Sequence, residues 1–137
     1  MISTKGRYAL RVMLDLAEQN QEKFVPLEEI ATRQGISKKY LEAILKILAK
    51  NNLLEILRGR KGGYKLAKKP ADYTVGEILK LTDEENLTAV SCLKKDCVPC
   101  ERKDFCKTLP MWKEFDKLTQ DFFSGITLEN LLTQKSL

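Results

Sequence analysis

Hydrophobic and polar residues alternate with a helical period over the first part of the chain. Ser3 and Thr4 are both good capping residues, and after them apolar residues recur every three or four positions until about Gln19. A polar stretch follows, and Phe24 and Val25 then form a short apolar pair typical of an extended segment. The pattern predicts an opening amphipathic helix, a loop and a brief strand-like piece.

Two more apolar stripes of helical spacing come next and lie close together in the sequence. Pro26 suits the first turn of a second helix, and Gly35 is expected to end it. Ser37 is a good N-cap for a third helix, which Asn51 and Asn52 close. Two helices joined by so short a turn have the spacing of a helix-turn-helix motif.

A candidate β-hairpin follows the third helix. Leu53–Leu57 is expected to be a strand, Arg58–Gly63 a glycine-rich turn and Tyr64–Leu66 the returning strand. Because it directly follows a helix-turn-helix, this hairpin is a candidate wing.

Beyond the hairpin, a short helical pattern gives way to an irregular one. Thr74 and Glu77 have the spacing of a capping box, and they predict a short helix that runs through Leu81. The stretch from Cys92 to Cys106 has no hydrophobic periodicity. We therefore expect it to be a loop that depends on something bound for its order.

The C-terminal part begins with a longer apolar stripe. Its residues step by four, three and four positions: Met111, Phe115, Leu118 and Phe122. Such a seam predicts a long helix that packs against a partner helix, which Gly125 should end, and a short helix should follow Thr127. The expected fold is mostly α with a small β-hairpin. It comprises a winged helix-turn-helix over residues 1–82, a cysteine-rich loop over 83–107, and a dimerisation helix with a final short helix over 108–137.

The composition is that of a soluble globular protein. The chain has 137 residues, of which 43% are hydrophobic and 31% charged. No apolar run approaches the roughly 20 residues that cross a bilayer, and the charged start does not resemble a signal peptide. We therefore expect a cytoplasmic protein that does not bind a membrane. The net charge of +5 and the isoelectric point near 9.0 suit a polyanionic partner.

Charged side chains gather on the third predicted helix and on the hairpin tip. Lys38, Lys39 and Glu42 lie opposite the apolar stripe, a pattern that is also typical of an ordinary solvated helix face. The tip at residues 58–63 adds three cations among glycines, which allow close approach to a sugar-phosphate backbone. The two features in this order favour DNA binding.

Three motifs give the sequence a family resemblance. The K-G-R-Y opening, the G-I-S-K-K-Y-L-E start of the third helix and the R-G-R-K-G-G-Y hairpin resemble the bacterial winged-helix regulator family of IscR, NsrR and CymR. The similarity extends over nearly the whole chain and is greatest to the iron–sulfur-binding members. It implies a homodimer, formed through the long C-terminal helix, that sets two winged heads on a palindromic operator in double-stranded DNA.

The resemblance also implies which residues meet DNA. The start of the third helix is expected in the major groove and the arginines of the hairpin near the minor groove. The full expected set is Lys5, Arg7, Ser37, Lys38, Lys39, Tyr40, Glu42, Arg58, Arg60 and Lys61.

The four cysteines of the chain are confined to residues 92–106. Cys92, Cys97, Cys100 and Cys106 are separated by four, two and five residues, and the first three have the spacing seen in plant-type ferredoxins. In a reducing compartment standing disulfides are not expected, and soft thiolates select iron–sulfur clusters or zinc over hard cations. The residues alone leave an iron–sulfur site, a structural zinc site and a thiol redox switch as alternatives.

The resemblance narrows these alternatives. Family members that sense iron–sulfur status or nitric oxide carry three cysteines ahead of a tryptophan, which Cys92, Cys100, Cys106 and Trp112 match. In the iron–sulfur-assembly regulator a histidine three residues after the last cysteine completes the site. Here that position is Leu109, and the chain contains no histidine. The resemblance favours a [2Fe–2S] cluster over a [4Fe–4S] cluster, with zinc as the alternative.

The sequence alone therefore does not identify the fourth ligand of the metal centre. Cys97 is the simplest possible fourth ligand, and the other candidates are a carboxylate such as Asp96 or Asp104 and a residue of the partner subunit. A bound cluster would order the loop and influence the neighbouring dimerisation helix.

One functional hypothesis and two alternatives follow. We expect a DNA-binding transcription regulator, repressor or activator, whose operator binding responds through an iron–sulfur cluster to iron–sulfur status, redox state or nitric oxide. The alternatives are the same regulator with a zinc site or thiol switch, and a small electron-transfer protein. An enzyme is not expected, because the chain has no histidine base, no phosphate-binding glycine loop before a helix and no recognisable carboxylate pair.

Overall fold

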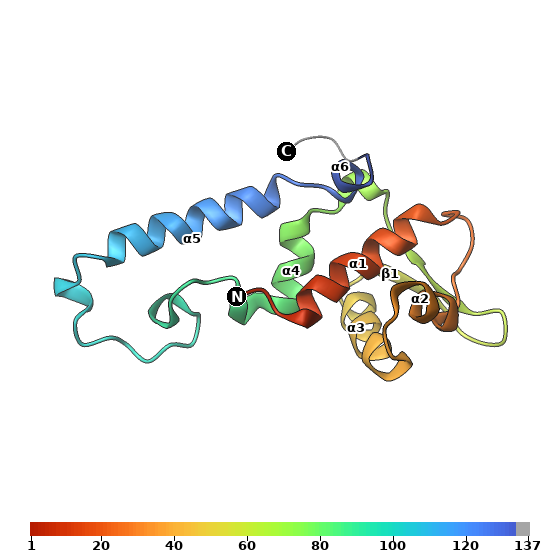
Figure 1. Cartoon of the computed structure of the whole chain (residues 1–137), viewed down its shortest axis with the longest axis horizontal. Helices are drawn as coiled ribbons and strands as arrows, with labels where there is room; N and C mark the ends of the chain where they lie inside the picture. The colour runs from red at the N-terminus through yellow and green to blue at the C-terminus, as the bar shows by residue number, and fades with distance from the viewer. Residues whose placement is uncertain (134–137) are drawn as a thin grey trace.

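Helices form most of residues 1–133, the part of the chain that the computed structural model describes (Figure 1). The helices are α1 (Thr4–Glu18), α2 (Leu27–Gln34), α3 (Lys38–Lys50), α4 (Val75–Asp83), α5 (Leu109–Ser124) and α6 (Leu128–Leu132). The strands are β1 (Leu54–Leu57) and β2 (Gly63–Leu66). The predicted fold class, mostly α with a small hairpin, is confirmed.

The ends of the helices follow the capping chemistry of the sequence. Ser3 caps α1 by accepting a hydrogen bond from the backbone N–H of Gly6 at 3.1 Å, and Ser37 caps α3 in the same way. Gly35 ends α2 with φ of 64°, in the left-handed region that favours glycine. These helix boundaries confirm the predicted ones to within a residue or two.

The capping box predicted at α4 forms only in part. The hydroxyl of Thr74 accepts from the backbone N–H of Glu77 at 3.1 Å, as expected. The carboxylate of Glu77 lies 3.7 Å from Nζ of Lys68 and pairs with it instead of returning to the backbone of Thr74. By contrast, Thr127 and Asn130 form a complete box at α6.

The wing is a two-stranded hairpin with one isolated bridge added at its edge. β1 and β2 pair antiparallel from Leu54 opposite Leu66 to Leu57 opposite Gly63, and Val25 adds a bridge to Tyr64 on the other edge of β2. A Cβ on Gly63 would lie 2.2 Å from the carbonyl oxygen of Val25, so only glycine permits this approach. The predicted extended piece at residues 24–25 therefore contributes to the wing.

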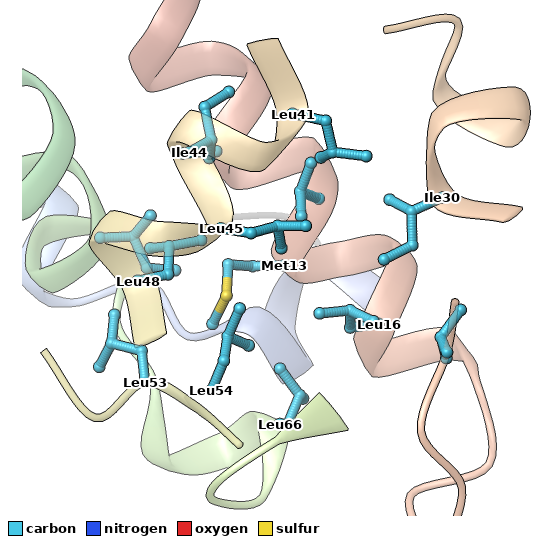
Figure 2. Packing of buried hydrophobic residues seen from close by; sticks show 14 of the residues in the cluster. Met13, Leu16, Ile30, Leu41, Ile44, Leu45, Leu48, Leu53, Leu54 and Leu66 are labelled. Carbon is cyan, nitrogen blue, oxygen red and sulfur yellow. The ribbon is translucent and has the colours of Figure 1, made fainter. Parts of the chain in front are cut away.

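The hydrophobic core lies among α1, α2, α3 and the hairpin (Figure 2). Met13 of α1 lies between the leucines of α3 and those of the hairpin, and it is completely buried, as is Leu45. Tyr73 is also completely buried, and its hydroxyl donates to the carbonyl of Leu53 at 2.6 Å. The core thus holds α3 and the wing in one rigid head.

The last helix returns to this head across a long sequence separation. Leu128 of α6 is completely buried in the same core, and its backbone N–H donates to the carbonyl of Tyr73 at 3.1 Å. Thr127 forms an isolated bridge with Thr74. The predicted three-part division of the chain stays a prediction, and within it α6 packs with the winged head.

The segment between α4 and α6 is built differently. α5 extends away from the head, and the cysteine loop runs beside it and back to the end of α4 (Figure 1). Within residues 84–125, all of which the structure describes, no side chain is buried. The loop is irregular apart from short 3-10 turns at Glu84–Asn86, Ser91–Leu93 and Lys103–Phe105. No helix in the described part of the chain is long and apolar enough to cross a membrane.

Candidate functional site

The polar face of α3 carries the first group of predicted DNA-contacting residues. Ser37, Lys38, Lys39, Tyr40 and Glu42 are all exposed, while the opposite face of α3 is buried in the core. The hydroxyl of Ser37 accepts from the backbone N–H of Tyr40 at 3.3 Å, which leaves its own hydrogen free to donate outward. A rigid helix therefore presents a polar face at its positively polarised N-terminal end.

Contacts with α1 and α2 fix the orientation of this face. The rings of Tyr8 and Tyr40 meet edge to face with centroids 5.8 Å apart, and the guanidinium of Arg11 lies 5.0 Å above the Tyr8 ring. The Arg11 side chain also donates to the side chain and backbone carbonyl of Gln34 at the end of α2. This cluster ties the start of α3 to both preceding helices.

An ion pair also stabilises the packing of α1 against α2. The carboxylate of Asp15 is buried, and it accepts from the guanidinium of Arg33 at 2.8 Å and from the side chain of Gln34 at 2.8 Å. Its hydrogen bond with Asp15, together with the charge on that carboxylate, raises the pKa of Arg33 despite partial burial. A buried carboxylate with this many donors holds α1 and α2 in one relative position.

The hairpin tip carries the second group. Arg58, Arg60 and Lys61 are exposed, and no carboxylate of the described residues forms a salt bridge with any of them. By contrast Lys38 lies 3.8 Å from the carboxylate of Glu28. The tip is therefore an uncompensated cationic surface, which favours contact with a polyanion.

The remaining two predicted residues lie at the start of α1. Lys5 is half-buried, whereas Arg7 is exposed and its guanidinium donates to the hydroxyl of Thr4 at 3.2 Å. Neither makes a direct hydrogen bond or ion pair with the polar face of α3 among the described residues. Their predicted contact with DNA stays a prediction.

All four cysteines line one cavity of about 290 Å³ between the loop and the start of α5. They are free thiols, of which those of Cys92 and Cys100 are exposed and those of Cys97 and Cys106 half-buried. Lys103 and Lys113 line the same cavity and bring two cations next to the thiols. The sequence analysis missed both lysines, because nothing in the spacing of charges identifies which of the many nearby lysines face the cysteines.

Local hydrogen bonds fix the position of two of these thiols and lower the pKa of one of them. The thiol of Cys97 donates to the backbone carbonyl of Cys92 at 3.1 Å. Sγ of Cys106 lies 3.3 Å from the hydroxyl of Thr108, the N-cap residue of α5. Hydrogen bonds from the side chain and backbone of Thr108 lower the pKa of the Cys106 thiol, and the charge of Arg102 acts in the same direction.

The donor set fits a thiophilic metal centre. Four thiols around a cavity far larger than the about 10–15 Å³ that one water needs are suitable ligands for an iron–sulfur cluster or zinc. Within residues 1–133 no three cysteine, aspartate or glutamate side chains already converge as a ligand set. Ligation would therefore require the loop to close around the cavity, as expected of a metal site that forms together with local structure.

A buried carboxylate joins the start of the cysteine loop to the head. Asp83, the last residue of α4, accepts from the backbone N–H of Ser3 at 2.7 Å and from the side chain of Asn86 at 2.7 Å. Gly6 lies against it, and a Cβ there would be 2.8 Å from the Asp83 carboxylate. The sequence does not predict this junction, since its pattern places Asp83 in the cysteine-rich loop over 83–107 and not at the end of a helix.

Comparison with known proteins gives consistent results at the levels of family, sequence and fold. Residues 2–134 match the Rrf2 family, described as iron-dependent transcriptional regulator. The chain is similar to the HTH-type transcriptional regulator IscR of Pectobacterium atrosepticum, with 38% identity over 136 residues that cover 99% of this chain and 81% of that protein.

Solved structures are similar over the same extent. T. potens IscR is 35% identical, with a TM-score of 0.75 and coverage of 98% of this chain and 87% of that one. The structure of CymR, described as the global cysteine regulator of B. subtilis, is 30% identical, with a TM-score of 0.77 and coverage of 99% and 98%. Both similarities include the cysteine loop and α5 as well as the head.

Proposed function

Because the chain belongs to the Rrf2 family of transcriptional regulators, we propose that it binds a palindromic operator as a homodimer, under the control of an iron–sulfur cluster held by the cysteine loop. The observation that carries the DNA-binding part is that one head presents both an uncompensated cationic tip and the exposed polar face of α3. Both belong to one rigid head, so they can engage one stretch of duplex together.

Each side chain of this surface has a role that its chemistry allows. Lys39 and Ser37 suit phosphate or guanine contacts in the major groove, and Glu42 suits the amino group of cytosine. Arg58 and Arg60 suit the narrow minor groove or its flanking phosphates. Tyr40 is held edge to face against Tyr8, so it can meet DNA without losing much side-chain entropy.

The proposed homodimer rests on the apolar stripe of α5. Met111, Phe115, Leu118 and Phe122 form an apolar stripe, and each is at least half exposed in the single chain. A stripe of this length on a helix that extends from the head is stabilised when a second copy covers it. Twofold pairing through α5 sets two heads side by side, which a palindromic operator matches.

The regulatory part rests on the cysteine cavity and on the family description as iron-dependent. Cys92, Cys100 and Cys106 would hold the cluster, which supplies a centre whose integrity depends on iron supply, oxidants and nitric oxide. The thiol of Cys106 lies against the N-cap of α5. Closing the loop on this thiol would therefore bias the start of α5, and with it the spacing of the two heads.

The wing provides the test of the DNA surface. Arg58→Ala and Arg60→Ala are each expected to weaken operator binding and to reduce the slope of log affinity against log salt by roughly one unit, if the residue meets a phosphate. Lys117→Ala, which removes an exposed cation from α5, is the matched control and should leave both quantities unchanged. Unchanged binding in both wing variants would exclude the wing from the interface.

Metal analysis tests the regulatory part. Protein purified without oxygen should show visible absorption bands and contain iron with acid-labile sulfide, and its operator affinity should change when the cluster is removed. Stoichiometric zinc without sulfide would replace the cluster by a structural zinc site. Equal affinity of the loaded and cluster-free protein for every operator tested would remove the sensing role and leave DNA binding intact.

A further inference from the structure

We propose that Cys97 is the fourth ligand of the metal centre, so that four thiolates of one subunit hold it. The inference deepens the proposed function, because it presumes a thiophilic centre at this loop. It distinguishes Cys97 from the neighbouring carboxylates Asp96 and Asp104 and from any residue of a second subunit.

The first support is geometric. Of the four residues whose side chains offer metal-binding atoms at the 290 Å³ cavity, all are cysteines, and Cys97 is one of them. Its thiol lies 3.1 Å from the backbone carbonyl of Cys92, and its backbone N–H donates to the carbonyl of Lys94 at 3.2 Å. The chain between Cys92 and Cys97 is thus folded back, which brings the Cys97 thiol next to the backbone of Cys92.

The neighbouring carboxylates are placed differently. Asp96 does not line the cysteine cavity. It lines a neighbouring, larger cleft of about 1210 Å³ among the loop, α4 and α5, which Cys92, Cys97 and Cys100 also line and Cys106 does not. Asp104 lines neither cavity and is exposed on the turn Lys103–Phe105. The 290 Å³ cavity is therefore the one that all four cysteines line, and no carboxylate lines it.

The second support is electrostatic. A fourth thiolate adds a negative charge that a neutral ligand would not add, and such a site is stable only where cations compensate it. Lys103 and Lys113 line the same cavity and supply two positive charges. They come from either side of the last cysteine, one from the loop and one from α5, so the compensation persists if the loop closes.

The third support is the absence of the alternative donor from the sequence. Leu109 lines the cysteine cavity, and the chain contains no histidine. A leucine there contributes an apolar wall and no donor atom. The extra cysteine at position 97 supplies the donor that this wall lacks.

Alkylation of the intact full-length protein tests the inference directly. Protein purified without oxygen is treated with iodoacetamide before and after metal removal by a chelator, and the modified cysteines are identified by mass spectrometry. We expect protection of all four cysteines in the metal-loaded protein and loss of protection in the metal-free protein. Free reaction of Cys97 while the other three stay protected would overturn the inference and leave the proposed cluster intact.

Metal analysis of the same sample separates the two proposals. Four protected cysteines with iron and sulfide support both. Four protected cysteines with zinc alone support Cys97 as a ligand and reject the iron–sulfur cluster. Reaction of all four cysteines in protein as purified means that no metal is held, and it rejects both.

Variants give an independent readout. Cys97→Ser should lower metal retention at least about tenfold and shift the absorption and electron paramagnetic resonance spectra of whatever cluster remains. Asp96→Asn and Asp104→Asn are the matched controls and should leave both spectra unchanged. An unchanged spectrum in Cys97→Ser, or a shift confined to either aspartate variant, would overturn the inference.

A rescue variant distinguishes a lost ligand from a misfolded loop. In the double variant Cys97→Ser with Leu109→His, the imidazole replaces a side chain that lines the same cavity as the missing thiol. We expect metal retention to recover and the reduction potential to rise above that of the unmodified protein, because imidazole in place of thiolate raises the potential of such centres. If metal retention does not recover in the double variant and the spectrum of Cys97→Ser alone is unchanged, Cys97 is not the fourth ligand.

Discussion

The head and the segment that extends from it are stabilised by different means. The head buries most of its apolar side chains around Met13 and Leu45, so its structure follows from the hydrophobic effect within one chain. Residues 84–125 bury none of their side chains, although they include the long helix α5 and four thiols. A segment without its own core needs partners outside the chain for its order.

The difference has a functional meaning. A region with few buried contacts has a low local stability, and its conformation responds to whatever binds it. A second copy along α5 and a metal centre at the cysteines are the two partners that the chemistry of this segment fits. The head can therefore keep one DNA-binding conformation, while the conformation of the attached segment changes with the signal.

The largest effect expected from this comparison is on the head. Leu45→Ala removes most of a completely buried side chain from α3, which should lower the free energy of unfolding by about 3 kcal/mol through lost burial and the cavity left behind. Val98→Ala, at a side chain that is 87% exposed in the loop, is the control and should have no measurable effect. Urea unfolding followed by circular dichroism measures both.

A small effect of Leu45→Ala would mean that the head is not the unit that folds on its own packing. A large effect of Val98→Ala would mean that the loop packs against something in the free protein. Either result would remove the contrast between the two regions.

The sequence predicts the head well because its signals are local. Helical periods, the caps Ser3 and Ser37 and the turn glycine Gly35 each act within a few residues, and the core reinforces the same elements. The glycines of the wing also mark a turn whose geometry few other residues adopt. Where local preference and tertiary packing agree, the period of the hydrophobic residues is sufficient to predict the helices and strands.

The sequence predicts long-range contacts less well, since its patterns do not say what a helix packs against. The return of Leu128 to the head and the burial of Asp83 under the start of α1 depend on residues more than 40 positions apart. Nor does cysteine spacing show that Lys103 and Lys113 face the thiols. These features require the three-dimensional arrangement, because no local period encodes them.

The next effect in size concerns the dimer. Phe115→Glu places a carboxylate in the apolar stripe of α5, where Phe115 is 51% exposed in the single chain. Burying that unpaired charge against a second copy should raise the dimer dissociation constant at least about 100-fold. Analytical ultracentrifugation measures the constant, and urea unfolding of the head should be unchanged at concentrations where both proteins are monomeric.

Lys117→Glu introduces the same carboxylate on another face of α5, where the lysine is exposed and pairs with Asp121 at 2.9 Å. It should leave the dimer largely intact. If it separated the subunits as strongly as Phe115→Glu, the apolar stripe would not be the contact surface.

A smaller effect is expected at the junction between the two regions. Gly6→Ala would bring a Cβ within 2.8 Å of the Asp83 carboxylate, which hydrogen bonds to Ser3 and Asn86 hold in place. Crowding of this kind costs about 1–3 kcal/mol, and the better helix propensity of alanine returns up to about 1 kcal/mol. The head should therefore lose roughly 1 kcal/mol of stability in urea unfolding.

Gly125→Ala is the matched control, because a Cβ there has its nearest neighbour at an ordinary 3.4 Å. Equal stability of the Gly6→Ala variant and the unmodified protein would show that Asp83 moves aside easily. The head and the cysteine loop would then be joined less firmly than the hydrogen bonds indicate.

The smallest expected effect is the pH dependence of this same junction. Burial by itself raises the pKa of the Asp83 carboxyl, but hydrogen bonds from Ser3 and Asn86 outweigh it, so the pKa lies below its ordinary value of 3.8. A carboxyl whose pKa is lower in the folded than in the unfolded protein stabilises the fold above the ordinary value. That contribution is lost as the pH falls through the lower, folded value.

Asp83→Asn removes this titration and should be less stable than the unmodified protein at neutral pH. The difference in the free energy of unfolding should stay constant down to about the ordinary value of 3.8 and shrink at lower pH, as the carboxyl of the unmodified protein is protonated. Urea unfolding at a series of pH values measures it, with the exposed Asp72→Asn as the control. A difference that grew on acidification would reverse the sign of the interaction, and Asp83 would then weaken the joint between head and loop.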